Sequence, residues 1–309
     1  MTPPDAGTPS GAIWMSFIRR RDLLLVTADP KPEMLASVDA GARLHALVLD
    51  RGQLWGIDYD GNAIECRAES GELLARMPVA QGPNHLAVGP EAVWVNHRLS
   101  SLASTVIARS DFSVDHVDLP GWVFAVTPEA LWLWQSRHFD DATLVRLDRG
   151  TSEERRIVSG QNIGSFLVRD DCVWVAAYPT PDRLSVLSLD GSLLREAAAP
   201  VHLSSLRADP EGVVALHEAA QASSAVVQFH DPGQIARSVT VPYAYDVALA
   251  PTTIAVATGQ RPWGEDRGED FFIDVLDRVT LAVIGRVRLP DAVRSLAVKG
   301  AESRRDSWS

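Results

Sequence analysis

The eight histidines of this 309-residue chain are unevenly distributed among its short apolar segments. Six of them fall at two kinds of position. His45, His85 and His202 lie at or just before a predicted first strand, and His97, His138 and His217 lie at the end of a predicted second strand or in the loop after it. Imidazole binds divalent metals and exchanges protons near neutral pH, so this distribution indicates acid–base or metal-assisted chemistry. His85 and Asp246 occupy equivalent positions in their segments, and Glu218 follows His217. We therefore expect the catalytic groups among His45, His85, Asp246, His202, His217 and Glu218.

Other polar and aromatic residues fall in the same parts of the sequence and are candidates for substrate binding. Trp122 and Trp263 lie outside the position that most tryptophans of this chain share, in predicted loops, where an indole could stack on a flat or apolar ligand. The full set of predicted substrate-binding residues is Asn84, Trp122, Asn162, Tyr243, Tyr245, Arg294 and Trp263.

A repeating unit of about forty residues must position these side chains. Tryptophan recurs at nearly constant spacing at positions 14, 55, 94, 132 and 174. Each interval holds short β-branched and apolar runs separated by Gly, Pro and Asp, which fits four short strands. A repeat of about forty residues that contains such short strands is typical of a β-propeller. We interpret the recurring tryptophans as packing between blades and assign them no chemistry.

The two ends of the repeat predict how the ring closes. Ala215 and Ala255 take the tryptophan position in later units. Residues 294–300 read as a first strand with no second strand after it, whereas 12–17, 22–28 and 34–40 read as second, third and fourth strands. We therefore predict an all-β, seven-bladed propeller with four antiparallel strands per blade, closed by N-terminal strands joining a C-terminal strand. It would span residues 11–300, with disordered tails at 1–10 and 301–309.

Composition limits the partners and the compartment. The net charge of −11 argues against nucleic acid and against anionic membrane surfaces, which both need a basic protein surface. No apolar run approaches the length of a transmembrane helix, and removing Arg19–Arg21 with the short run that follows as a signal would delete three strands. We expect a cytoplasmic, bacterial protein. Cys66 and Cys172 fall in opposite blades, so we expect no disulfide between them.

The segment HLAVGPEAVWV at residues 85–95 resembles the repeat of the streptogramin B lyase family, as do the segments VFAVTPEALWL and FLVRDDCVWV further along the chain. This resemblance implies a cytoplasmic seven-bladed propeller and a magnesium-dependent enzyme that opens a cyclic depsipeptide by elimination. The family's catalytic histidine and glutamate lie in its late blades. Here the corresponding blade has Tyr245 and Asp246 and no His–Glu pair at that spacing, so those catalytic residues are not transferred.

Two classes of function follow. The first is a small-molecule enzyme of specialised metabolism, a lyase, cyclase or isomerase, that acts at the mouth of the central channel. Its histidines and Asp246 would serve as acid–base groups or hold a divalent metal such as magnesium. The second is a non-catalytic propeller that binds a ligand or a protein partner. Clustering of the histidines favours the enzyme, with a small molecule as its partner.

Overall fold

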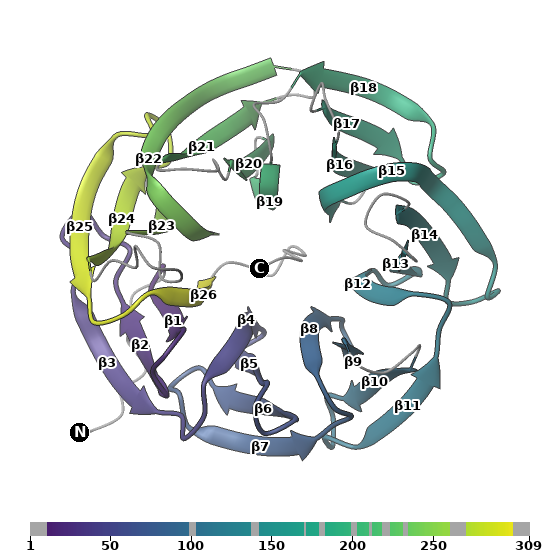
Figure 1. The fold of residues 1–309 in the computed structure, drawn as a ribbon, viewed down its shortest axis with the longest axis horizontal. Helices are drawn as coiled ribbons and strands as arrows, with labels where there is room; N and C mark the ends of the chain where they lie inside the picture. Colours follow the sequence, from purple (N-terminus) through teal and green to yellow (C-terminus); the bar gives the residue numbers. More distant parts are fainter. Residues whose placement is uncertain are drawn as a thin grey trace, which may run out of the picture.

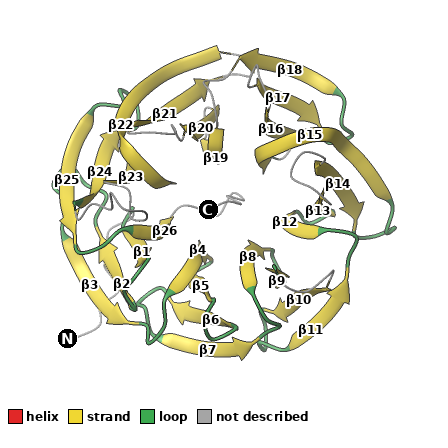
Figure 2. Cartoon of the chain, viewed as in Figure 1, coloured by secondary structure: helices red, strands yellow, loops and turns green. Residues whose placement is uncertain are grey.

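The computed structural model describes residues 11–98, 103–136, 142–169, 171–178, 183–198, 203–209, 212–217, 223–230, 234–259 and 270–298. These residues form antiparallel β-sheets, and the described part of the chain contains no helix (Figure 2). It therefore has no helix long and apolar enough to cross a membrane. The predicted tails, 1–10 and 301–309, lie outside the described residues.

Three sheets have four strands each. The first combines the two ends of the described chain, with β26 (Val293–Val298) beside β1 (Ile13–Phe17), then β2 (Asp22–Val26) and β3 (Met34–Asp39). The second contains β4 (Leu44–Asp50), β5 (Gln53–Asp58), β6 (Ala63–Ala68) and β7 (Leu73–Pro78). The third contains β8 (Pro83–Val88), β9 (Ala92–His97), β10 (Ala103–Ala108) and β11 (Val114–Asp118).

Two sheets have seven strands, because one long strand in each belongs to two successive units. The first runs through β12 (Trp122–Val126), β13 (Ala130–Ser136), β14 (Ala142–Asp148), β15 (Glu154–Val168), β16 (Cys172–Tyr178), β17 (Arg183–Ser188) and β18 (Leu193–Ala198). The second runs through β19 (Leu203–Asp209), β20 (Gly212–His217), β21 (Ser223–His230), β22 (Gln234–Leu249), β23 (Thr253–Gly259), β24 (Phe271–Asp277) and β25 (Val283–Leu289). The first half of β15 pairs with β14 and the second half with β16, and β22 is shared in the same way.

The sheets stand around a common axis, as in a β-propeller (Figure 1). The first strand of each unit lies nearest the axis, and the fourth strand lies at the rim. Apolar clusters fill the space between neighbouring units. Trp14 packs with Leu44 and Leu54 of the next unit, and Trp132 packs with Phe166. The burial of Trp14, Trp55, Trp132 and Trp174 confirms the predicted packing role, and Trp94 is half-buried against a further apolar cluster.

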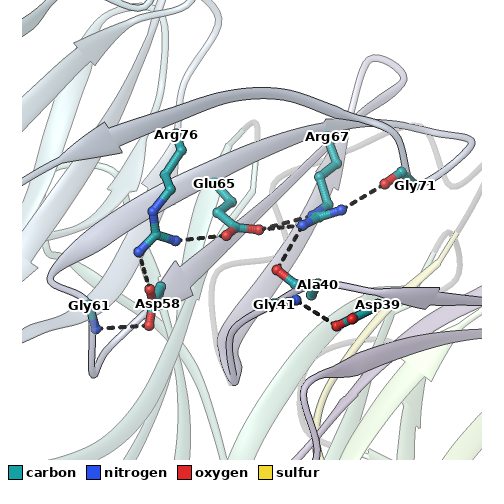
Figure 3. A network of polar contacts seen from close by, with 9 residues as sticks. All are labelled: Asp39, Ala40, Gly41, Asp58, Gly61, Glu65, Arg67, Gly71 and Arg76. Carbon is teal, nitrogen blue, oxygen red and sulfur yellow. Dashed lines mark hydrogen bonds and ion pairs between the residues drawn. The ribbon is translucent and has the colours of Figure 1, made fainter.

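A buried ionic network joins the first two units (Figure 3). Glu65 accepts hydrogen bonds from Arg67 at 2.8 and 3.0 Å and from Arg76 at 2.8 Å. Arg67 also donates to the carbonyl oxygens of Gly71 at 2.9 Å and of Ala40, in the preceding unit, at 3.1 Å. The side chains of Glu65 and Arg67 are almost completely buried, so their charges depend on each other.

Arginines after the third strands join units at the end of the ring where each first strand turns into the second. Arg109 pairs with Asp50 of the preceding unit, and Arg278 repeats this with Asp209 through a 2.8 Å contact. Arg109 also donates to the carbonyl of Gly89. These charges therefore already have structural partners.

The two cysteines are free, as expected. Burial raises the pKa of each thiol to about 11, so both are uncharged and poorly nucleophilic at neutral pH.

Candidate functional site

A β-bulge recurs near the start of the first strands. The unpaired extra residues are Ala46–Leu47 in β4, Asn84 in β8, Phe124 in β12, Gly164 in β15, Ser204 in β19, Tyr245 in β22 and Arg294 in β26. We call these positions the bulge ring, because their equivalent register puts them at one level around the axis. A bulge interrupts the ladder and re-aims a side chain, and such bulges are common beside functional sites.

Backbone groups released by the bulges are bound by polar side chains of the preceding unit. The buried Asn96 accepts a hydrogen bond from the Val123 amide at 2.9 Å. The Ser224 hydroxyl accepts one from Ala244 at 2.9 Å, and the Ser295 hydroxyl accepts one from Leu47 at 3.0 Å. Because a buried amide without a partner is costly, these polar side chains stabilise the joints between units.

Asp246 belongs to the same kind of joint. One carboxylate oxygen accepts from Arg207 at 2.9 Å and from the Val247 amide at 2.8 Å, and the other accepts from the Leu296 amide at 2.9 Å. Asp246 is 2% exposed. Burial raises its pKa, while Arg207 and the two amides oppose that shift. Its contacts therefore join three units and indicate a structural role.

His85 is buried next to a second joint. Its Nδ1 lies 3.3 Å from the amide nitrogen of Asn96, and its ring lies 4.4 Å from the ring of Phe124. Burial lowers the pKa of His85 from 6.5 to about 4, so the ring is neutral at physiological pH. It shares the bulge register with Asp246, but the two side chains contact different partners.

The low pKa of His85 predicts that acid weakens the fold. Below pH 6.5 the unfolded chain gains a proton at this residue while the folded chain stays neutral until about pH 4, so stability falls across that window. Between pH 7.5 and 5 this group should cost about 2 kcal/mol. Urea unfolding at both pH values should show a smaller acid-induced loss in His85→Gln than in the wild type. An equal loss in both proteins would contradict the assignment.

His45 and Arg294 belong to the neighbouring first strands β4 and β26, which contact each other. Arg294 is exposed, yet burial lowers the pKa of its guanidinium, which indicates that neighbouring protein partly desolvates the charge. Among the described residues, no carboxylate forms an ion pair with it. Burial, followed by the positive charge of Arg294, lowers the pKa of His45 to about 4. The half-buried His45 ring stacks on Tyr59 with a centroid distance of 5.8 Å and a 6° angle between the planes.

Two further aromatic groups lie at this level. The ring centroids of Tyr243 and Tyr245 are 5.3 Å apart, and those of Tyr245 and Phe271 are 6.3 Å apart. Burial raises the pKa of Tyr245, so its hydroxyl is protonated. In β12, the ring centroid of Phe124 lies 6.3 Å from that of Trp122 in the same strand and 5.2 Å from that of Trp134 in β13. Asn84 has a buried side-chain oxygen without a hydrogen-bond donor among the described residues.

The remaining candidates are placed only in part. His217 is half-buried at the end of β20, opposite Leu203 and Ala225. Asn162 lies in β15 opposite Tyr178, and its side chain is outside the described residues, as are His202, Glu218, His138 and Trp263. His97 is a core residue that bonds the Thr105 hydroxyl at 2.8 Å. Within the described part of the chain, no three His, Cys, Asp or Glu side chains are arranged to hold a metal.

Sequence reasoning missed Phe124, Tyr59 and Asn96. A partial signal existed, because a polar residue recurs after the bulge in otherwise apolar strands: His85, Ser165, Ser205, Asp246 and Ser295. That recurrence points to joints between units rather than to one catalytic cluster.

Comparison with known proteins supports the fold. No protein-family model matches the chain, and no curated protein matches it. The structure of AztD from Citrobacter koseri aligns with a TM-score of 0.69 and 11% identity, covering 94% of this chain and 98% of that one. A putative 6-phosphogluconolactonase from Bacteroides fragilis aligns at 0.63 and 11%, covering 95% and 99%. Streptogramin B lyase aligns at 0.57 and 13%, covering 80% and 86%. The propeller resemblance expected from the repeat is thus supported, and at these identities it concerns the fold alone.

Proposed function

We propose that this chain is a seven-bladed propeller, closed by the pairing of β26 with β1, and that it binds a small anionic molecule at the bulge ring. The observation that carries the proposal is Arg294, an exposed and partly desolvated guanidinium for which the described residues provide no ion-pair partner. A desolvated charge is costly unless it is paired, and a guanidinium binds carboxylates and phosphates in a bidentate manner. The partner is a small molecule, and the proposed compartment is the bacterial cytoplasm.

The groups beside Arg294 also suit an anion. His45 is neutral, so one ring nitrogen carries a proton that can be donated. The Tyr245 hydroxyl is protonated and belongs to the neighbouring position of the bulge ring. The nearby carboxylates Asp58 and Asp60 pair with Arg76 and Arg43, which reduces their repulsion of an incoming anion.

We expect Arg294→Gln to weaken anion binding about tenfold to a hundredfold, because one charge-assisted hydrogen-bonding group is lost. The measurement is the rise in melting temperature of the full chain on addition of acetate, citrate or inorganic phosphate, since a ligand that binds the folded state stabilises it. Arg21→Gln is the matched control, because it removes the same charge from another exposed site. Equal stabilisation of both variants would disprove the role of Arg294.

A lyase or cyclase that acts on the bound anion is the second candidate, favoured by the neutral His45 beside Arg294. In that reaction His45 would accept a proton while Arg294 holds the anionic group. Conversion of the ligand by wild-type protein but not by His45→Gln, with binding unchanged, would support it. His85 and Asp246 are omitted from this mechanism because their contacts are structural. A divalent metal is also omitted, because the described side chains form no cluster of ligands for one.

A further inference from the structure

Three polar side chains form a hydrogen-bonded chain across one unit, from its rim to its buried interior. His116 is exposed in β11, at the rim (Figure 1), whereas Thr105 in β10 and His97 in β9 are buried. The hydroxyl oxygen of Thr105 lies 3.2 Å from Nδ1 of His116 and 2.8 Å from Nε2 of His97. We propose that these residues form a pH-sensitive switch, in which protonation of His116 reverses both hydrogen bonds and moves the proton of His97 from Nε2 to Nδ1. This switch is independent of the anion site at Arg294.

The single proton of the Thr105 hydroxyl forces the two hydrogen bonds to run in the same direction along the chain. When Thr105 makes both bonds, it donates to one imidazole and accepts from the other. An uncharged His116 with its proton on Nε2 accepts at Nδ1, so His97 must donate through its Nε2 proton. A protonated His116 has no bare nitrogen and can only donate. Thr105 then turns its proton toward Nε2 of His97, and His97 must carry its own proton on Nδ1.

The buried end of the chain sets the direction when His116 is uncharged. Nδ1 of His97 is buried and has no hydrogen-bond partner among the described residues. A buried N–H group without an acceptor is rarer in proteins than a buried acceptor without a donor. The neutral chain therefore places the proton of His97 on Nε2, where Thr105 accepts it, and leaves Nδ1 bare.

His97 lies beside the linker that joins β7 to β8. It pairs with Pro83, and the amide of the next residue, Arg98, donates to the carbonyl of Gly82 at 2.8 Å. After Pro83 the chain continues into Asn84 of the bulge ring. A change in which nitrogen of His97 carries the proton therefore changes the hydrogen bonds offered to this linker, next to the bulge ring.

The switch takes up one proton in total. A proton from solvent binds Nδ1 of His116, while His97 releases its Nε2 proton to water and takes one up on Nδ1. Burial lowers the pKa of His97, while the backbone of Ala80 and Gln81 opposes that shift by accepting from a protonated ring. The positive charge therefore stays on His116, and His97 changes its tautomer rather than its charge.

The surroundings of the chain leave the control of His116 to the solvent. In β11, Asp115 accepts a hydrogen bond from the amide of His116 at 2.7 Å, and Asp118 is exposed; β10 contributes no titratable side chain. The apolar cluster that joins this unit to the preceding one contains Cys66 and Tyr59 but no carboxylate and no basic side chain. Imidazole exchanges protons near neutral pH, so the switch should act in that range.

The test is long-range ¹H–¹⁵N NMR of the full chain with ¹⁵N-labelled histidine between pH 8 and pH 5, because nitrogen chemical shifts report which ring nitrogen carries a proton. We expect the ratio of the two His97 tautomers to change about tenfold or more, toward Nδ1 in acid, with the midpoint of the His116 titration. In His116→Gln and in Thr105→Val, His97 should keep one tautomer throughout. Asp115→Asn is the matched control, because it changes a neighbouring charge, leaves the chain intact and should preserve the coupled change.

Four results would overturn the switch or its action. The first is a wild-type His97 with the same tautomer at both ends of the pH range. The second is a tautomer change that persists in Thr105→Val or His116→Gln, and the third is protonation of both His97 nitrogens with the same midpoint. Amide signals of Gln81 and Gly82 that ignore the titration would overturn the action on the linker. Thermal melts establish that each variant is folded, and the exposed His116→Gln tests the coupling without changing a buried residue.

Discussion

We expect Asp246→Ala to lower the free energy of unfolding by about 3–5 kcal/mol, because the substitution leaves the buried guanidinium of Arg207 without its counter-charge. It also removes the acceptor for the Leu296 amide of β26. The joint between the unit of β22 and the unit that contains β26 should therefore weaken. Urea unfolding followed by tryptophan fluorescence at pH 7.5 measures the change.

A matched control separates this effect from simple loss of charge. Asp60→Ala removes a carboxylate from an ion pair with Arg43 in which both side chains are largely exposed. Exposed pairs contribute little, so its unfolding curve should stay close to that of the wild type. A stable Asp246→Ala protein that had lost only ligand binding would return Asp246 to the functional site.

Glu65→Ala should destabilise the protein by a similar 3–5 kcal/mol, because Glu65 is the carboxylate partner of the buried Arg67. Arg67 would keep its bonds to the carbonyls of Gly71 and Ala40, but these do not neutralise its charge. The measurement is again the urea midpoint, read together with the slope of the transition.

The double variant Glu65→Leu, Arg67→Met tests the cause of that loss. Removing both charges and filling the space with apolar side chains should recover much of the stability lost in Glu65→Ala. If the double variant were as unstable as the single one, the defect would come from packing rather than from an unpaired charge.

The repeat period, the strand type and the buried tryptophans could all be read from local patterns. Period-two apolar runs and turn residues report short-range preferences, and a tryptophan at a fixed place in each unit reports a repeated packing position. The strand expected at 294–300 appears as β26, paired with β1. The strands and turns are encoded within a few neighbouring residues, and the repeat in the regular spacing of similar segments, so predicting them needed no knowledge of distant contacts.

Local patterns could not distinguish a catalytic side chain from a polar side chain that stabilises a joint between units. His85 and Asp246 were recognised as equivalent in register, but their partners are Asn96, Arg207 and the amide of Leu296, which lie 11, 39 and 50 residues away. Whether a buried polar side chain has all of its hydrogen-bond partners within the protein depends on such distant groups.

Arg294 was already a candidate from the sequence, whereas its exposure and its lack of an ion-pair partner among the described residues emerge only in the folded chain. The bulge that exposes Arg294 depends on how β26 pairs with β1, near the other end of the chain. The stacking of His45 on Tyr59 likewise depends on the pairing of β4 with β5. A single extra residue in a ladder changes which side chain faces the axis, and ladder register is a property of paired strands rather than of one segment.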